Sequence, residues 1–363
     1  MQDNTNESHE NGHRFLRYQM QAVAKHILPN NRVGICLRHQ IEKYGTVDVF
    51  KHRQTQKAFY GGLMVCGSVW ICPVCASKIS ERRRAELKHA SSSYRKAGGN
   101  LTMLTLTFSH SRSDKLDDSL KALGQAVLKF RSGKRYDALR KEMGLVGSVR
   151  AMEITYGKNG WHPHFHILNF HEIELDPWER LEYEERFYDL WSAACMKFGL
   201  RCSKEHGLKL DDATEADQYI GKWGDLIEKQ WGIDSEMTKS HIKKGKEEGL
   251  TPFDFLRKIV EDGDLEYAMQ YKEYAAAMKG KTQLKWSRGL KQKFAIEDKT
   301  DEQIAESKEE PADLLGGLTW QDWRYIIRNN YRAKLLDYIE LYGFEEALQR
   351  IGLDKKNHCY NEQ

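Results

Sequence analysis

The stretch Trp-His-Pro-His-Phe-His-Ile-Leu-Asn-Phe, residues 161–170, places histidines at three alternate positions, His162, His164 and His166. In an extended strand successive side chains point to opposite faces, so these three imidazoles share one face. The same stretch carries the apolar residues of a packed strand, namely Phe165, Ile167 and Phe170. A row of imidazoles beside apolar packing is what a divalent-metal site on a sheet requires.

The segment before the histidines predicts an oxygen ligand. Residues 149–156 are also strand-like, and the dipeptide Asn159-Gly160 is a strong signal for a hairpin turn. A turn at that dipeptide puts Glu153 opposite His166, and cross-strand partners share a face. The prediction depends on the turn, because a slip of one residue turns every side chain to the other face.

Glu153, His164 and His166 are therefore a candidate ligand set. Two imidazoles and a carboxylate with open positions suit Mn²⁺ or Mg²⁺ acting on a phosphate. An isolated His-x-His pair is more typical of a surface strand, but the position of Glu153 favours the metal site.

A second candidate metal site lies in the N-terminal region. Cys72-Pro-Val-Cys75 is a C-x-x-C knuckle, with Cys66 six residues before it and Cys36 further upstream. Four thiolates can complete a structural zinc site, although His39 is an alternative fourth ligand. A redox pair is the main rival, but no thioredoxin-like context is evident. The other cysteines show no ligand spacing and are interpreted as structural: Cys195, Cys202 and Cys359.

The overall composition is that of a soluble protein. The chain has 363 residues, of which 30% are charged and 40% hydrophobic, and a formal net charge of +4. This length suggests about two domains, and the small net charge means that nucleic-acid affinity must come from local patches. No apolar run reaches membrane-spanning length, and the polar N-terminus is unlike a signal peptide. We therefore expect a cytoplasmic protein without membrane contact.

The order of predicted elements indicates an α+β fold with helices on one face of a sheet. Hydrophobic periodicity predicts helices at 78–96, 114–131 and 176–198, a strand at 100–110 and a hairpin at 149–170. Residues 313–352 are expected to be helical. The predicted regions are a disordered tail (1–12), a basic zinc-binding region (13–99), a catalytic domain with a basic extension (100–296), a linker (297–312) and a C-terminal helical region (313–363).

A third group of polar residues falls on a predicted helix after the hairpin. Glu215, Tyr219 and Lys222 stand at i, i+4 and i+7 and so share one helix face. A tyrosine flanked by an acid and a base is a plausible nucleophile, because the acid can take a proton and the ammonium can stabilise phosphate charge. Taken alone, a tyrosine on a helix more often serves packing.

Two segments are locally basic. Residues 78–99 carry seven Lys or Arg against two Glu, and residues 279–293 carry six basic residues, no acid and Trp286. Basic side chains around an aromatic suit a surface that follows a phosphate backbone and stacks on bases. A solvated helix face and a basic loop are the alternatives.

Together these features resemble the rolling-circle replication initiators (Rep) of small bacterial plasmids, in the HUH endonuclease superfamily. The resemblance rests on the order of several motifs: Thr-Leu-Thr-Phe at 105–108, His164-Phe165-His166, Glu-x-x-x-Tyr-x-x-Lys at 215–222, the N-terminal cysteines and Lys-Trp-Ser-Arg-Gly-Leu at 285–290. It spans roughly residues 36–290.

The resemblance implies an HUH-type central antiparallel sheet of five strands, with the metal site on one face and the tyrosine helix over it. It implies a metal-dependent nick at a plasmid double-strand origin, where the DNA is single-stranded or extruded as a hairpin. His164 and His166 would bind the metal, and Tyr219 would attack the phosphate, leaving a 5′-phosphotyrosine and a 3′-OH. Glu215 matches the acid that activates water at termination. Lys222, as a residue that stabilises phosphate charge, is inferred from its helix position.

Host helicase, host polymerase and a second copy of the chain are the expected protein partners. Two other readings stay open. One is a related HUH transposase or relaxase, and the other is a non-enzymatic zinc-containing DNA-binding regulator. A single tyrosine argues against enzymes that use a tyrosine pair, and a regulator leaves the aligned metal ligands unexplained.

Overall fold

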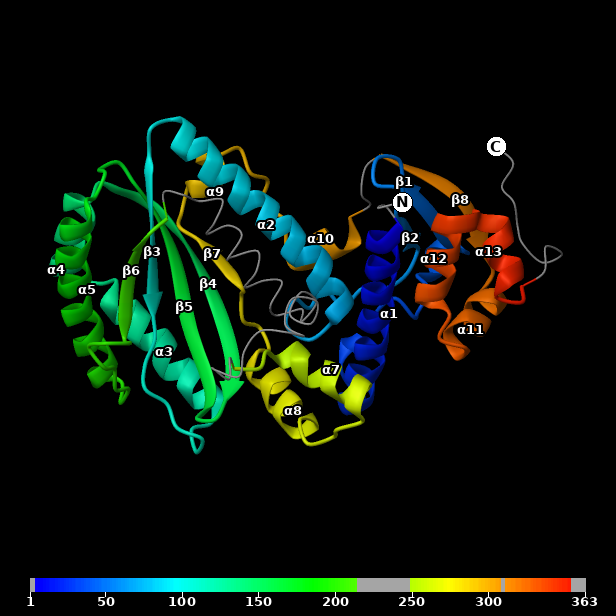
Figure 1. Ribbon diagram of the computed structural model, residues 1–363, viewed down its shortest axis with the longest axis horizontal. Coiled ribbons are helices and arrows are strands. Elements are labelled where there is room, and N and C mark those ends of the chain that lie inside the picture. The colour runs from blue at the N-terminus through cyan, green and yellow to red at the C-terminus, as the bar shows by residue number, and fades with distance from the viewer. Residues whose placement is uncertain (1–3, 214–248, 308–310, 354–363) are drawn as a thin grey trace. The chain divides into compact units, whose positions relative to one another are not determined.

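The computed structural model describes residues 4–213, 249–307 and 311–353, with side chains of the first helix from Arg14 onward. The chain forms two compact units (Figure 1). The first comprises Met1–Ile79, Leu256–Asp264 and Lys299–Gln363, and the second comprises Ser80–Phe255 and Leu265–Asp298. Helices are combined with two antiparallel sheets, so the predicted α+β class is confirmed.

The first unit is built on a three-stranded sheet of order β2-β1-β8. Its strands are β1 (Val47–His52), β2 (Ala58–Gly61) and β8 (Ala312–Leu318). Its helices are α1 (Asn4–Ile27), α10 (Asp301–Glu306), α11 (Trp320–Arg328), α12 (Arg332–Tyr342) and α13 (Phe344–Arg350), with 3₁₀ turns at Arg32–Gly34 and Glu42–Tyr44. Two helices are divided between the units, because a unit boundary falls within each of them: α2 (Pro73–Lys96) and α7 (Pro252–Asp262).

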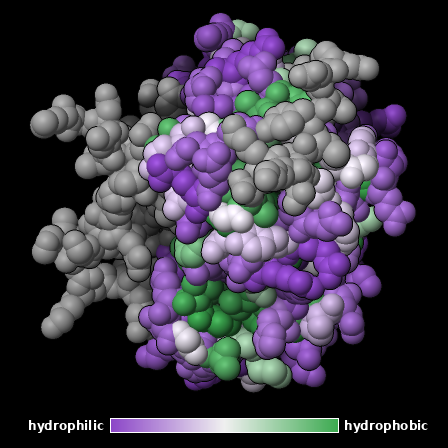
Figure 2. All heavy atoms as spheres, turned by 90° about the vertical axis from the view of Figure 1, so that its right-hand side faces the viewer, coloured by the Kyte–Doolittle hydropathy of each residue, from purple (hydrophilic) through white to green (hydrophobic). Residues whose placement is uncertain are grey.

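The C-terminal segment is helical only from Trp320 onward. Residues 312–318 pair with β1 as strand β8, so the expectation of helix from residue 313 is wrong for these residues. Cross-strand pairing explains the difference, since an edge of β1 was open to a partner that lies far away in sequence. Apolar residues of α11–α13 pack with both strands of the N-terminal hairpin in one core, which includes Val47, Tyr60, Trp323, Leu335 and Ile339. Figure 2 shows a mostly hydrophilic surface, with the most extensive hydrophobic area of this face in its lower part.

Helix α1 begins at Asn4, so residues 4–12, expected to be a disordered tail, form its first turns. These residues contain no proline, and helix propagation adds one hydrogen bond for each residue fixed. The part of α1 that follows is held by packing and ion pairs, with Met20 and Ala24 fully buried.

The second unit contains a five-stranded antiparallel sheet of order β6-β3-β5-β4-β7. Its strands are β3 (Asn100–Leu106), β4 (Leu145–Gly157), β5 (Gly160–His171), β6 (Leu208–Asp212) and β7 (Leu284–Trp286). Its helices are α3 (Leu116–Phe130), α4 (Lys134–Glu142), α5 (Pro177–Lys197), α8 (Ala268–Ala277) and α9 (Leu290–Lys293). The histidine strand β5 is central, which gives its side chains neighbours on both sides.

Helices cover both faces of this sheet, so the expectation of helices on one face is wrong. On one face Leu104, Leu106 and Ile167 pack with α3, α4 and α5 around Trp191. On the other face the alternate residues of the same strands, such as Met103 and Leu168, pack with Leu87, Ala90 and Tyr94 of α2. The strands that carry this second core are apolar on both sides, as expected for a sheet covered twice.

No helix among the described residues is long and apolar enough to cross a membrane.

Candidate functional site

The β4–β5 hairpin turns one residue earlier than the sequence predicted. Gly157 pairs with Gly160, so the turn residues are Lys158-Asn159. Gly160 takes the positive φ, +83°, that a glycine adopts without strain. The register therefore differs by two residues from the predicted one, and Glu153 pairs with His164, not with His166.

The predicted face survives this shift, because the side-chain period of a strand is two. Glu153 lies directly opposite His164 and diagonal to His166, which pairs with Ala151. Glu153 Oε2 is 3.0 Å from His164 Nε2 and 3.1 Å from His166 Nε2. One ligand atom of each of the three residues lies within 4.8 Å of the others.

Hydrogen bonds orient both imidazoles. His164 Nδ1 lies 3.2 Å from the carbonyl oxygen of His162, and His166 Nδ1 lies 3.1 Å from Thr105 Oγ1 on the neighbouring strand β3. Because a carbonyl oxygen only accepts, His164 Nδ1 carries the proton, and its Nε2 points toward Glu153. In neutral His164 that places a lone pair against a carboxylate oxygen at 3.0 Å. A proton or a metal ion between these atoms removes the repulsion, and two imidazoles with a carboxylate are a donor set that fits a divalent metal ion.

The carboxylate and the imidazoles of the group stabilise each other's charged forms. Burial opposes ionisation of Glu153, but His164 and His166 outweigh it and hold the pKa of Glu153 well below its usual range. Burial lowers and Glu153 raises the pKa of His164, and the effect of the carboxylate is larger. Glu153 and His164 are each 8% exposed, so it is the imidazoles that keep the carboxylate ionised in a nearly dry site.

His162 lies on the same face of the sheet as Glu153, His164 and His166, but it is not one of these three potential metal ligands. Its ring stacks on His110 with centroids 4.6 Å apart and on His164 at 4.7 Å. Burial, with the charges of His164 and His110, lowers the pKa of His162 to about 3. The group of potential ligands found in the described residues contains two histidines and leaves His162 out.

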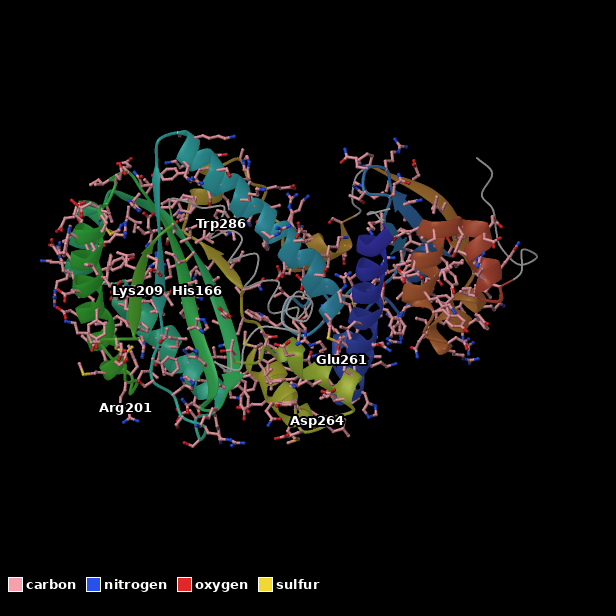
Figure 3. All side chains as sticks on the ribbon, in the orientation of Figure 1. His166, Arg201, Lys209, Glu261, Asp264 and Trp286 are labelled. Atoms are coloured by element: carbon pink, nitrogen blue, oxygen red, sulfur yellow. The ribbon has the colours of Figure 1, made fainter. Side chains whose placement is uncertain are left out.

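Figure 3 shows His166 on β5 within the sheet, with Lys209 on β6 toward one edge and Trp286 on β7 at the other. Lys209, Thr105 and His166 lie in one cross-strand row. Strand β6 ends at Asp212, opposite Thr102, three residues along β3 from that row. The predicted Glu215, Tyr219 and Lys222 follow β6 in the chain and lie outside the described residues.

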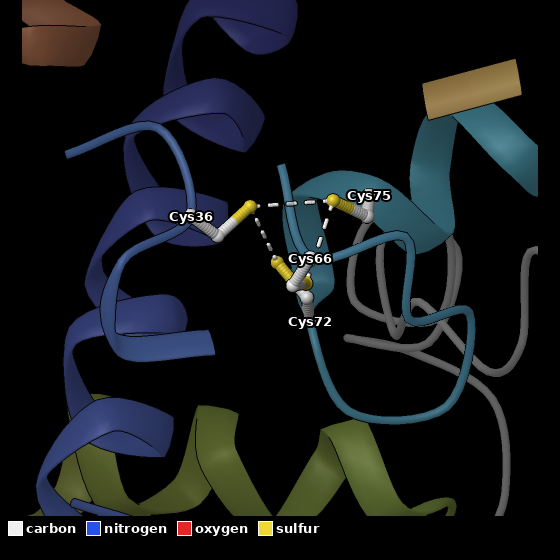
Figure 4. A group of neighbouring side chains, drawn as sticks. All are labelled: Cys36, Cys66, Cys72 and Cys75. Carbon is white, nitrogen blue, oxygen red and sulfur yellow. Dashed lines mark hydrogen bonds between the residues drawn. The ribbon is translucent and has the colours of Figure 1, made fainter. Parts of the chain in front are cut away.

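The four cysteines of the N-terminal region come together in the first unit (Figure 4). Sulfur–sulfur distances are 3.3 Å for Cys36–Cys75, 3.6 Å for Cys66–Cys75 and 3.7 Å for Cys72–Cys36. These are far longer than a disulfide bond and close to the roughly 3.8 Å between ligands of a tetrahedral zinc–thiolate site. All four side chains are buried, whereas His39, the alternative fourth ligand, is exposed.

The surroundings of the cysteines are positively charged, which suits a metal–thiolate complex with a net negative charge. Arg332 is 2% exposed and Arg38 is 7% exposed. Arg332 donates to Gln21 Oε1 at 2.7 Å, and the Gln21 amide donates to Cys72 Sγ at 3.3 Å. Burial and Arg332 lower the pKa of Arg38 to about 10, partly offset by the cysteines. Two buried cations beside four thiolates balance the charge of a zinc–tetrathiolate site, so the donor set fits zinc.

One cysteine of the cluster is primed to ionise. Burial disfavours a thiolate at Cys72, but hydrogen bonds with Cys36, Cys66 and Cys75 outweigh it and lower the pKa of Cys72. Contacts with Cys36 and Cys72 raise the pKa of both Cys66 and Cys75. Metal binding requires deprotonated cysteines, so a bound cation favours ionisation of these thiols.

Sequence reasoning missed several residues that support the two groups. Thr105 was visible as a hydroxyl within a strand, and its pairing with His166 could have been sought from the alternation of β3. Gln21, Arg38 and Arg332 gave no signal, because they reach the cysteines from distant segments.

A family model described as "Replication protein" matches residues 63–195. This segment contains Cys66, Cys72 and Cys75 together with Glu153, His164 and His166, but ends before residues 215–222.

Individual proteins give the same result. The chain is 27% identical over 304 residues to "Protein rep" of Streptomyces lividans, with 65% of each protein covered. It is 30% identical over 103 residues to "Protein rep" of Lentilactobacillus hilgardii, covering 28% of this chain and 31% of that protein. A "Neomycin resistance protein" of Streptomyces cyanogenus is 30% identical over 132 residues, 30% of each protein. No solved structure matches the chain. The family match and the two Rep relatives agree with the motifs noted in the sequence, so the resemblance to Rep replication proteins is confirmed.

Proposed function

We propose that this protein starts rolling-circle replication of a plasmid by nicking one DNA strand at the double-strand origin. The observation that carries the proposal is the convergence of Glu153, His164 and His166 on neighbouring strands, in a chain that resembles Rep replication proteins. In an HUH-type arrangement a metal site with two histidines serves a tyrosine nucleophile. This arrangement gives a role to Glu153, His164 and His166 and to Tyr219.

In this proposal Glu153, His164 and His166 hold Mn²⁺ or Mg²⁺. When bound, the ion supplies Lewis-acid polarisation of a phosphate oxygen, so that a modest nucleophile suffices. Thr105 and the carbonyl of His162 fix the imidazoles so that both Nε2 atoms face Glu153. The low exposure of the site keeps competing water away from Glu153 and His164.

Tyr219 is the proposed nucleophile. Its hydroxyl oxygen forms a bond to phosphorus while the bond to the 3′ oxygen breaks, giving a 5′-phosphotyrosine and a 3′-OH for the host polymerase. The proton of the tyrosine leaves and the 3′ oxygen gains one, so the step is a transesterification without net hydrolysis. Glu215 is proposed to activate water at termination, and Lys222 to stabilise charge on the phosphate.

The remaining parts of the proposal concern binding. Zinc held by Cys36, Cys66, Cys72 and Cys75 has a structural role, since the sulfurs are buried and four-coordinate sites are closed. Nicking requires single-stranded or hairpin DNA, because the scissile phosphate must reach the site. A host helicase and a second copy of this chain are proposed partners.

The test is a covalent-adduct assay on single-stranded oligonucleotides that tile the plasmid encoding the protein. We expect a metal-dependent, SDS-resistant adduct on one oligonucleotide, lost in Tyr219→Phe and kept in the matched control Tyr44→Phe, at a half-exposed tyrosine of the first unit. Glu153→Gln should abolish the adduct, while Glu205→Gln, at a highly exposed carboxylate, should not.

An adduct that persists in Tyr219→Phe would support the proposed nuclease activity and would show that a residue other than Tyr219 is the nucleophile. No adduct on any oligonucleotide, with metal shown to be bound, would favour a DNA-binding regulator without nuclease activity.

A further inference from the structure

A pocket of about 240 Å³ opens in the second unit where α3, α4 and the start of β4 meet the end of β7. Its polar lining comes from Arg131, Tyr136, Arg140, Ser148, Ser287 and Arg288. The volume is below the roughly 300–1,000 Å³ of pockets that enclose drug-sized ligands. The space thus suits a small group.

The pocket is separate from the potential metal ligands Glu153, His164 and His166. Ser148 and Glu153 stand five residues apart on β4, so their side chains point to opposite faces of the sheet. Five residues of strand span roughly 16 Å. A ligand in this pocket cannot touch Glu153, so the pocket can serve in binding but not in the proposed chemistry.

The charge of the pocket is positive and unbalanced. Arg131, Arg140 and Arg288 all line it, and no acidic residue does. Across the described parts of the chain, none of these three guanidiniums forms an ion pair, whereas Arg186 on the nearby helix α5 pairs with Glu142 at 2.6 Å. Burial, followed by the charge of Arg131, lowers the pKa of neighbouring Arg150. Arg131 thus acts as a positive charge on Arg150.

Hydroxyl groups add uncharged donors to the same space. Arg131 Nη2 donates to Ser148 Oγ at 3.1 Å, and the Ser148 backbone N–H donates to Ser287 Oγ at 2.9 Å. Both serine oxygens accept these bonds, which leaves each hydroxyl hydrogen available to a ligand. A Cβ on Gly147 would lie 2.8 Å from Ser287 Oγ, so glycine permits this close approach. The pocket therefore presents several donors without an acidic acceptor.

We propose that this pocket binds a phosphate group of a DNA strand and so anchors the DNA away from the metal site, an inference that rests on the proposed action on DNA. Arginine forks match the geometry of phosphate oxygens, and serine hydroxyls supply further donors to them. Two of the lining residues, Ser287 and Arg288, belong to the basic segment 279–293, which carries no acid. A free nucleotide presents the same chemical group and is the other possible source of the phosphate.

The test compares two double variants of matched charge. Arg140→Ala/Arg288→Ala removes two exposed lining arginines, and Lys134→Ala/Arg135→Ala removes two exposed cations of α4 that do not line the pocket. DNA affinity is measured by fluorescence anisotropy with a labelled single strand and a labelled duplex, as a function of salt. Binding of ATP and of inorganic pyrophosphate is measured by calorimetry. No divalent metal is added, so the outcome is independent of nicking.

We expect the pocket variant to weaken DNA binding by about tenfold and to reduce the salt dependence by about two released counterions, beyond the control variant. Loss of ATP binding with unchanged DNA affinity would assign the phosphate to a nucleotide and overturn the DNA anchor. Equal behaviour of the two double variants toward every ligand would overturn the phosphate pocket altogether. Because the substituted arginines are exposed and unpaired within the described residues, we expect both variants to fold, which circular dichroism checks.

Discussion

Glu153 lies directly opposite His164 across the β4–β5 hairpin, with Glu153 Oε2 3.0 Å from His164 Nε2. The same oxygen lies 3.1 Å from His166 Nε2, so one carboxylate oxygen serves two imidazoles on the central strand of the sheet. The cross-strand position of Glu153 and the alternation of β5 create the group together. Four predictions concern this group, the cysteine cluster and the ion pairs of the first unit.

Thr105 is predicted to position His166 without touching the metal. Thr105→Val removes the oxygen 3.1 Å from His166 Nδ1 while keeping the shape of the side chain. We expect metal affinity to fall by about 10–100-fold, as is typical when an outer partner of a metal-binding histidine is lost. Mn²⁺ titration followed by electron paramagnetic resonance measures this, and Thr105→Ser should restore affinity. Full affinity in the valine variant would contradict the role.

His162 is predicted to be dispensable for metal binding. The described ligand group contains only Glu153, His164 and His166, and the His162 ring is stacked between its neighbours. His162→Ala should leave the Mn²⁺ dissociation constant unchanged, whereas His166→Ala should raise it strongly. The same titration checks both variants. A loss in His162→Ala equal to that in His166→Ala would indicate a three-histidine site.

The cysteine cluster is predicted to hold one zinc ion that stabilises the first unit. Cys72→Ser should lose zinc, measured by elemental analysis, and should lower the melting temperature because metal binding is coupled to folding. Cys195→Ser is the control, since Cys195 is a buried cysteine of the second unit that lies outside the cluster. Equal zinc content in wild type and Cys72→Ser would count against the site.

Asp337 is predicted to make the first unit less stable as the pH rises from 4 to 7. Burial and Glu340 raise the pKa of Asp337 to about 6, despite the ion pair with Arg14 at 2.6 Å. An unfolded Asp has a pKa of about 3.9. At a pH between these two pKa values, Asp337 binds more protons in the folded state than in the unfolded state. The contribution of Asp337 is therefore fully present below pH 4 and is lost as the pH rises through 6.

The size of this effect is on the order of 2–3 kcal/mol across the window. Urea unfolding of wild type and of Asp337→Asn at several pH values measures it. The free energy of unfolding of the wild type should fall relative to that of the variant as the pH rises. Parallel pH profiles would show that Asp337 titrates alike in both states.

The sequence by itself determined the hairpin, the neighbouring strand β3 and the helices α2, α3 and α5, and it determined the face shared by Glu153, His164 and His166. Alternation of residue types was enough to place His164 and His166 on one face, because the two-residue period of a strand is a property of the backbone. That period also explains why an error of one residue in the predicted turn did not change which side chains share a face. Moving the turn to Lys158-Asn159 changed the partner of Glu153 by two residues and left its face unchanged. The C-x-x-C spacing similarly pointed to Cys72 and Cys75 before any fold was known.

Tertiary structure alone decided how distant segments complete these groups. The choice of Cys36 rather than His39, and the approach of Gln21 and Arg332 to the cysteines, depend on packing between segments up to 311 residues apart in the chain. The pairing of residues 312–318 with β1, and the arginine pocket formed by α3, α4 and the end of β7, are likewise invisible to local patterns. The physical reason is that periodicity reports which face of an element is apolar, but not which other element covers it.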